Sequence, residues 1–107
     1  MMEWYRAQLK SKLPELFEKW EERIGVKANE VGVKNMRTKW GKCNTKDKRV
    51  WINLQLAKKP IEYLEYMVVH ELVHLLEKNH MTVFVDYMDK FWPDWRVTKE
   101  ELMLEYK

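Results

Sequence analysis

The sequence predicts an α+β fold in which a small, mostly antiparallel sheet packs on a central helix, with further helices near both ends of the chain. Three observations predict it. Apolar residues recur at helical spacing over residues 3–24, extended segments flank a polar turn at residues 44–48, and a helical apolar run covers residues 60–78. The chain has 107 residues, of which 46% are apolar and only three are Gly, so it fits one ordered domain spanning 1–107.

The first helix is predicted over residues 3–24, where charged residues separate the apolar ones. The apolar residues are Trp4, Leu9, Leu13, Leu16, Phe17 and Trp20. Pro14 interrupts this pattern, so we expect it to kink or split the helix. Gly25 is expected to end it.

Extended structure is predicted for residues 27–40, in which valines alternate with other residues and Gly32 could mark a bulge. The polar residues 44–48 suit a hairpin turn, and residues 49–54 are predicted to form the next strand. These segments are the basis for the small sheet.

The central helix is predicted from Pro60, which suits a first helical turn, to about Lys78. Because this segment is apolar on several sides, we expect a buried helix. A further helix is predicted over residues 82–91, where a following proline ends it. The last helix is expected to begin at Thr98, because Thr98 and Glu101 match a capping box.

The run His70-Glu71-Leu72-Val73-His74 stands in the middle of the central helix. Residues four apart share one face of an α-helix, so His70 and His74 can bind one Zn²⁺ ion. Glu71 stands beside His70, where its carboxylate could take a proton from a water molecule on the metal. Burying these three side chains without a partner would be costly, which favours a metal site over a chance pattern. This arrangement is typical of zincins.

The third zinc ligand needs a separate argument, since a catalytic zinc usually has three protein ligands and an open position for water. At ~1.5 Å per residue, Glu77 would stand about 10 Å above His70, too far to share the ion easily. We therefore expect the helix to end near residues 78–79, so that the chain turns back and offers His80 as the third ligand. Three later acidic residues are the alternatives: Glu100, Glu101 and Glu105.

The net charge of +3 does not by itself indicate a nucleic-acid-binding protein. One stretch is basic and includes Trp40 and Trp51 as candidate stacking groups, but a solvated hairpin face explains it better than nucleic-acid binding does. Its basic residues are Lys34, Arg37, Lys39, Lys42, Lys46, Lys48 and Arg49.

Cys43 is the sole cysteine, so no intramolecular disulfide can form. No run of ~18 apolar residues and no signal-peptide pattern is present, so we expect a cytoplasmic protein without a membrane partner.

Several motifs carry a family resemblance. They are residues 35–43 with Trp40-Gly41-Lys42-Cys43, residues 51–56 followed by Pro60, and residues 70–75 followed by Asn79-His80 and Phe84. In this order they resemble the motifs of the YgjP-like metallopeptidases, which are related to SprT-like proteases and to the minimal-scaffold gluzincins (minigluzincins). The resemblance covers about residues 26–104 and implies a zinc-dependent peptidase with a compact α+β fold. It implies that His70, His74 and His80 are zinc ligands and that Glu71 is the general base.

The expected reaction is peptide hydrolysis, in which Glu71 takes a proton from the attacking water and passes it to the leaving amine. The strand Val50–Leu54 could offer an edge to an extended substrate, although a plain packing role fits it equally well. Four residues could stabilise the oxyanion by their chemistry alone: Tyr63, Tyr66, Tyr87 and Arg96.

Two alternatives concern activity. A binding module with a structural zinc would have a closed four-ligand site without an open water position. A latent peptidase would have the segment Thr98–Lys107, or a neighbouring copy of the chain, folded across the cleft. The expected partners are therefore a peptide or protein substrate and, in the latent form, a second copy of the chain.

Overall fold

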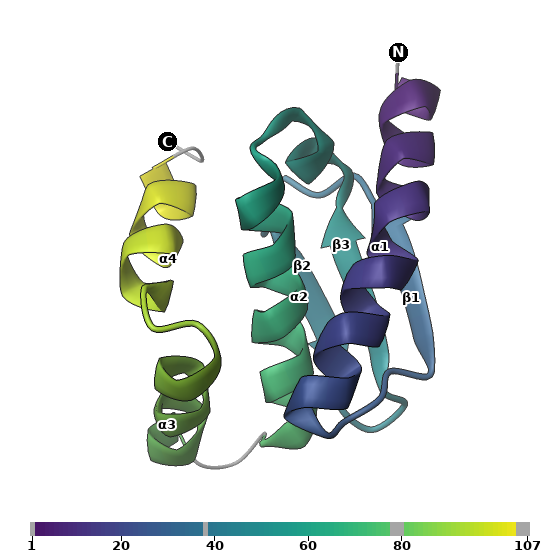
Figure 1. The fold of residues 1–107 in the computed structure, drawn as a ribbon. Coiled ribbons are helices and arrows are strands. Elements are labelled where there is room, and N and C mark those ends of the chain that lie inside the picture. The colour runs from purple at the N-terminus through teal and green to yellow at the C-terminus, as the bar shows by residue number, and fades with distance from the viewer. Residues whose placement is uncertain (1, 38, 78–80, 105–107) are drawn as a thin grey trace.

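The computed structural model describes residues 2–37, 39–77 and 81–104. The elements, in chain order, are α1 (Met2–Ile24), β1 (Glu30–Lys34), β2 (Gly41–Asn44), β3 (Arg49–Asn53), a short 3-10 helix η1 (Leu54–Lys58), α2 (Ile61–Leu76), α3 (Met81–Phe91) and α4 (Trp95–Leu104). This confirms the predicted α+β fold class, with helices packed on a small sheet (Figure 1).

The three strands form one sheet in the order β1-β3-β2. The predicted hairpin is present, because β2 pairs antiparallel with β3 and residues 45–48 form the turn between them. β1 pairs parallel with β3, so the sheet is mixed where we predicted a mostly antiparallel one. This pairing requires the chain between β1 and β2 to cross the end of β3.

The buried side chain of Asn53 holds that crossover in place. Its Nδ2 donates to the carbonyl of Met36 at 3.0 Å and to the carbonyl of Lys39 at 2.7 Å, and its Oδ1 accepts from the N–H of Gln55 at 3.0 Å. Buried amides of this kind need their hydrogen bonds satisfied. One side chain at the end of β3 therefore ties the crossover to the start of η1.

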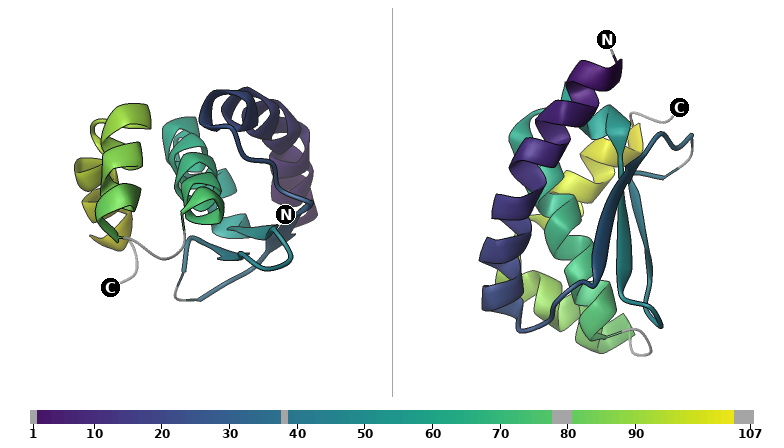
Figure 2. Two further views of the ribbon diagram at one scale, coloured as in Figure 1. Left: turned by 90° about the horizontal axis from the view of Figure 1, so that it is seen from below. Right: turned by 90° about the vertical axis from the view of Figure 1, so that its right-hand side faces the viewer.

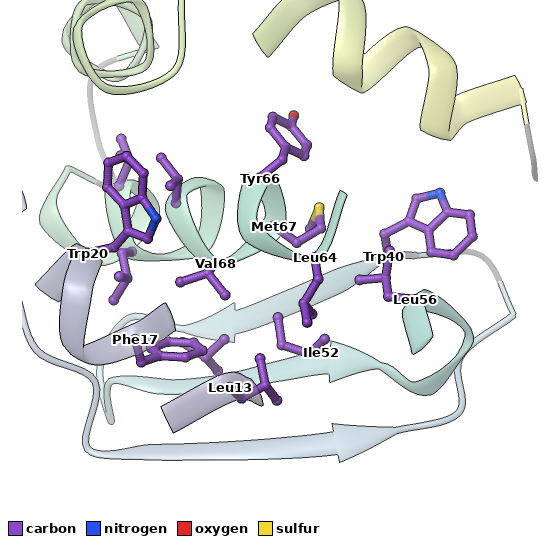
Figure 3. Close-up of a cluster of buried hydrophobic side chains, with 14 of the residues drawn as sticks. Leu13, Phe17, Trp20, Trp40, Ile52, Leu56, Leu64, Tyr66, Met67 and Val68 are labelled. Atoms are coloured by element: carbon purple, nitrogen blue, oxygen red, sulfur yellow. The ribbon is translucent and has the colours of Figure 1, made fainter. Parts of the chain in front are cut away.

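The helices lie on one face of the sheet, and α2 lies between α1 and the pair α3 and α4 (Figure 2). The predicted central helix is thus confirmed. Figure 3 shows side chains of α1, β3 and α2 meeting between the sheet and the helices. The labelled ones include Leu13, Phe17, Ile52, Leu64 and Val68, all of them buried.

α1 matches its predicted range and runs through Pro14 as one helix, so the expected split does not occur. It ends as predicted at Gly25, whose φ of +86° lies in the left-handed region that favours glycine. Glu65 of α2 fastens α1 in place, since it accepts hydrogen bonds from Lys19 Nζ at 2.8 Å and Trp20 Nε1 at 2.7 Å.

The last helix begins three residues earlier than predicted. α4 starts at Trp95, so Thr98 is inside the helix, and the predicted capping box is wrong. The Thr98 hydroxyl instead lies 3.3 Å from the carbonyl of Asp94 and 3.3 Å from Trp92 Nε1, which donates to it. The Trp95 indole anchors the true helix start by donating to Asp89 at 2.8 Å. Within the described ranges, none of the helices combines the length and apolar character needed to cross a membrane.

Candidate metal centre and active site

His70 and His74 lie together on α2, as their spacing predicts. Their ring centroids are 4.5 Å apart, and the rings meet edge to face. Phe84 of α3 stacks on His74 with a centroid distance of 4.4 Å and meets the ring of His70 at 5.4 Å. The packing of α3 against α2 therefore holds both imidazoles in one apolar cluster.

A nitrogen atom of this cluster lacks a partner. Within the described part of the chain, His70 Nδ1 is buried without a hydrogen bond, and its neighbour Glu71 Oε2 lies 3.7 Å away. A buried polar atom without a partner is costly, and such atoms in native proteins call for an explanation. Two imidazoles one helical turn apart, one with an unpartnered buried nitrogen, fit a site for a metal ion such as zinc.

The protonation state of His74 is also consistent with binding a metal ion. Burial and the neighbouring His70 lower the pKa of His74, and Lys99 of α4 contributes in the same direction, against an opposing effect of Glu71. A lowered pKa favours the neutral imidazole, which is the form that binds a metal ion.

Glu71 points from α2 toward the sheet side of the site and is 3% exposed. It lies against Gly41, where an added Cβ would stand 3.3 Å from Glu71 Oε2 and 2.8 Å from Met67 Cε. Any larger residue at position 41 would push on the carboxylate and on Met67. Gly41 thus lets the start of β2 approach the carboxylate that we predicted as the general base.

Cys43 of β2 is a second neighbour of Glu71. Burial, the charge of Glu71 and hydrogen bonding to its carboxylate raise the pKa of the Cys43 thiol to about 12. Burial and the same negative charge raise the pKa of Tyr66. The raised pKa favours the protonated thiol of Cys43 at neutral pH.

The predicted third ligand, His80, lies outside the described residues, as do residues 78–79 and the alternative Glu105. α2 ends at Leu76, and Glu77 is its C-cap, with its N–H bonded to the carbonyl of Val73 at 2.8 Å. No group of three His, Cys, Asp or Glu side chains within 2–37, 39–77 and 81–104 could hold a metal ion. The alternatives Glu100 and Glu101, both exposed on α4, thus do not complete the site there.

A cavity of about 210 Å³ opens beside His70, between the start of β2, α2 and α4. Its lining is mainly apolar and comprises Trp40, Tyr66, Met67, Leu102 and Met103, with Lys39 and Lys99 also on its walls. Sequence reasoning missed Lys99. A signal was present, because Lys99, Leu102 and Met103 follow the i, i+3, i+4 spacing of one helix face.

Two other predictions about this region concern the substrate edge and the oxyanion. β3 is the central strand and is paired on both sides, so the predicted substrate edge at Val50–Leu54 is wrong. β2 is the edge strand beside Glu71. Among the four candidates for the oxyanion, Tyr66 lies by the histidines, with its ring centroid 5.7 Å from that of His70.

Two of the other oxyanion candidates, Tyr87 and Arg96, contact other side chains. Tyr87 stacks on Phe91 with a centroid distance of 6.2 Å, and Arg96 forms an ion pair with Asp89 at 2.9 Å.

In the basic stretch, Lys42 Nζ stands 5.3 Å from the ring centroid of Trp51, so a lysine already covers that candidate stacking group. This contact favours the interpretation of the stretch as a solvated hairpin face.

Comparison with known proteins yields two findings. A family model described as "YgjP-like, metallopeptidase domain" matches residues 1–105. The crystal structure of the metallopeptidase zymogen of Pyrococcus abyssi abylysin is similar in fold, with a TM-score of 0.76 and 18% sequence identity, over 86% of this chain and 92% of that one. A search among curated proteins finds no match.

Proposed function

Because the chain belongs to the YgjP-like metallopeptidase family, we propose that it is an endopeptidase whose catalytic zinc ion is held by His70, His74 and His80. One observation carries this proposal: two imidazoles meet at 4.5 Å on a buried helix, and the buried carboxylate of Glu71 stands beside them. Placed next to the metal ligands, that carboxylate suits a general base.

When bound, zinc would activate a water molecule and polarise the peptide carbonyl. Glu71 takes the proton of the attacking water at its carboxylate and then delivers it to the leaving amine. Cys43 of β2 is hydrogen-bonded to this carboxylate, and Gly41 leaves room for β2 to lie close to it, so Glu71 is positioned before the substrate arrives. Tyr66, next to His70, is the candidate to donate a hydrogen bond to the developing oxyanion.

We place the extended substrate along β2. Edge strands offer unpaired backbone groups that an added peptide strand can use, and β2 is the edge nearest to Glu71. This replaces the strand that the sequence suggested, since β3 has no open edge within the described sheet.

The test of the base is Glu71→Gln, with Glu62→Gln in the first turn of the same helix as the matched control. The Glu71 variant should keep one zinc ion per chain and lose peptidase activity by a factor of about 100 or more, the contribution typical of a general base. The Glu62→Gln control should keep both the zinc ion and the peptidase activity. Peptide cleavage at the wild-type rate by the Glu71 variant would disprove the assignment.

We further propose that the protein exists in a latent form. α4 packs across the cavity beside His70, where Leu102 is buried and its carbonyl is bonded to Trp40. The similar abylysin structure is described as a zymogen, which supports a latent state for this fold. α4 would then limit how far a substrate can reach the histidines.

A further inference from the structure

The cavity beside His70 has the size of a large amino-acid side chain. Its volume of about 210 Å³ exceeds that of an apolar cavity of ~150 Å³, which is enough to hold benzene. Met67 and Leu102 provide apolar walls, and Trp40 and Tyr66 provide aromatic ones. Because His70 belongs to the same lining, a side chain inserted here would stand next to the proposed metal ligands.

The charges at this cavity all have the same sign. Lys39 lines it from the chain before β2 and Lys99 lines it from α4, and both side chains are exposed. The Lys99 ammonium stands 6.0 Å from the ring centroid of Trp95, and its charge reaches His74. The two lysines come from different elements, one from the chain before β2 and one from α4, so a peptide that lies in the cavity would pass close to both.

We propose that this cavity is the specificity subsite of the enzyme, and that it takes a large apolar side chain flanked by acidic residues. The proposal rests on the peptidase function proposed above, and it names the class of substrate. Two lysines from different elements suit a chain that continues past the cavity, with a carboxylate before and after the inserted residue. A chain that ends in the cavity would bring a single terminal carboxylate in place of two.

The test measures binding rather than cleavage, in full-length, zinc-loaded protein carrying Glu71→Gln. The probes are four fluorescein-labelled peptides, the first with one Phe between two Asp and an amidated C-terminus. The second has Ser in place of Phe, the third has Asn in place of both Asp, and the fourth is the Asn peptide ending at the Phe with a free carboxylate. Fluorescence anisotropy gives the Kd of each.

The first peptide should bind about fivefold more tightly than the Asn peptide, an advantage within the range of exposed ion pairs. Lys99→Gln should reduce this difference to about twofold, because the pair with Lys39 remains, and Lys99→Arg should preserve it. Lys90→Gln on α3 is the matched control, because Lys90 does not line the cavity, and it should change nothing. The Ser peptide should bind more weakly than the first peptide in every variant.

Three results would overturn the proposal. These are equal binding of the Phe and Ser peptides, an unchanged Asp-to-Asn difference in Lys99→Gln, or tightest binding of the peptide with the free C-terminal carboxylate. Because the binding protein carries Glu71→Gln, the outcome does not depend on turnover. If the parent protein fails to cleave peptides while the Lys99 effect holds, the peptidase function falls and the subsite stands.

Discussion

The indole N–H of Trp40 donates a 2.9 Å hydrogen bond to the main-chain carbonyl of Leu102, 62 residues further along the chain. This bond joins the segment before β2 to α4 across the cavity that contains His70. The Leu102 side chain is itself buried, so α4 is fixed at this point by both a polar and an apolar contact. The same helix provides Lys99 and one wall of the cavity.

If α4 keeps the protein latent, its release should raise peptidase activity. Trp40→Phe removes a buried hydrogen bond of about 1 kcal/mol, which would shift an equilibrium between covered and open sites about fivefold. The initial rate of cleavage of a quenched fluorescent peptide measures this shift. Trp4→Phe, at an exposed tryptophan of α1, is the control. Trp40→Phe protein that is folded by circular dichroism but no more active than wild type would refute latency through α4.

Asn53 should be among the most sensitive polar positions of the fold. Asn53→Ala leaves the carbonyls of Met36 and Lys39 without the donor that holds the crossover, and buried unsatisfied groups cost about 1–3 kcal/mol each. We expect the free energy of unfolding to fall by about 2–4 kcal/mol in urea titrations. Asn35→Ala removes an exposed bond to Gln55 and should cost less than about 0.5 kcal/mol. Equal effects of the two substitutions would contradict this role of Asn53.

The hydrogen bonds of Glu65 between α1 and α2 should make the stability of the protein depend on pH. Partial burial alone would raise the pKa of Glu65, but hydrogen bonds from Lys19 and Trp20 outweigh it and lower the pKa. A carboxyl whose pKa is lowered by folding stabilises the protein above its unfolded pKa of about 4.3 and loses this contribution as pH falls through the folded value. Glu65→Gln should therefore cost about 1 kcal/mol at pH 7, with a smaller cost at pH 3.

The measurement is urea unfolding of wild type and Glu65→Gln at pH 7 and at pH 3, with Glu62→Gln as the exposed control on α2. The difference between wild type and the Glu65 variant should shrink at low pH. A difference that stays constant with pH would mean that the carboxylate charge of Glu65 does not stabilise the contact between α1 and α2.

Local patterns were sufficient to predict most of the helices and the placing of His70 and His74 on one helix face. α2 was evident from its apolar run, and helix geometry alone places His70 and His74 on one face. The hairpin between β2 and β3 followed from its polar turn. These features depend on residues close together in the sequence, which is why pattern reasoning found them.

Features that depend on distant contacts were not predictable in the same way. The parallel pairing of β1 with β3 rests on Asn53 holding a crossover 14 to 17 residues before it. The start of α4 was misplaced because a capping-box pattern at Thr98 competed with the bond from Trp95 to Asp89. Lys99 was missed because its importance arises only where α4 meets the cavity.

Cys43 provides a chemical probe of Glu71. With the pKa of its thiol raised to about 12, Cys43 should react with iodoacetamide at pH 8 about 100-fold or more slowly than an ordinary thiol of pKa about 8.5. Since the charge of Glu71 is one cause of the shift, Glu71→Gln should lower the pKa and speed up alkylation. Mass spectrometry of timed samples gives the rate, and guanidinium-unfolded protein gives the reference. If alkylation is as slow in Glu71→Gln as in wild type, the two side chains are not coupled.

The proposed third zinc ligand is tested by metal affinity. Loss of residues that only orient ligands typically costs 10- to 100-fold in affinity, so His80→Ala should weaken zinc binding by about 100-fold or more. Glu77→Gln is the matched control, because Glu77 caps the end of α2 and helix geometry excludes it as an easy ligand. Competition with a chromophoric chelator measures both affinities. Unchanged zinc affinity in His80→Ala would move the third ligand to a late carboxylate, and the same titration on Glu105→Gln would then identify it.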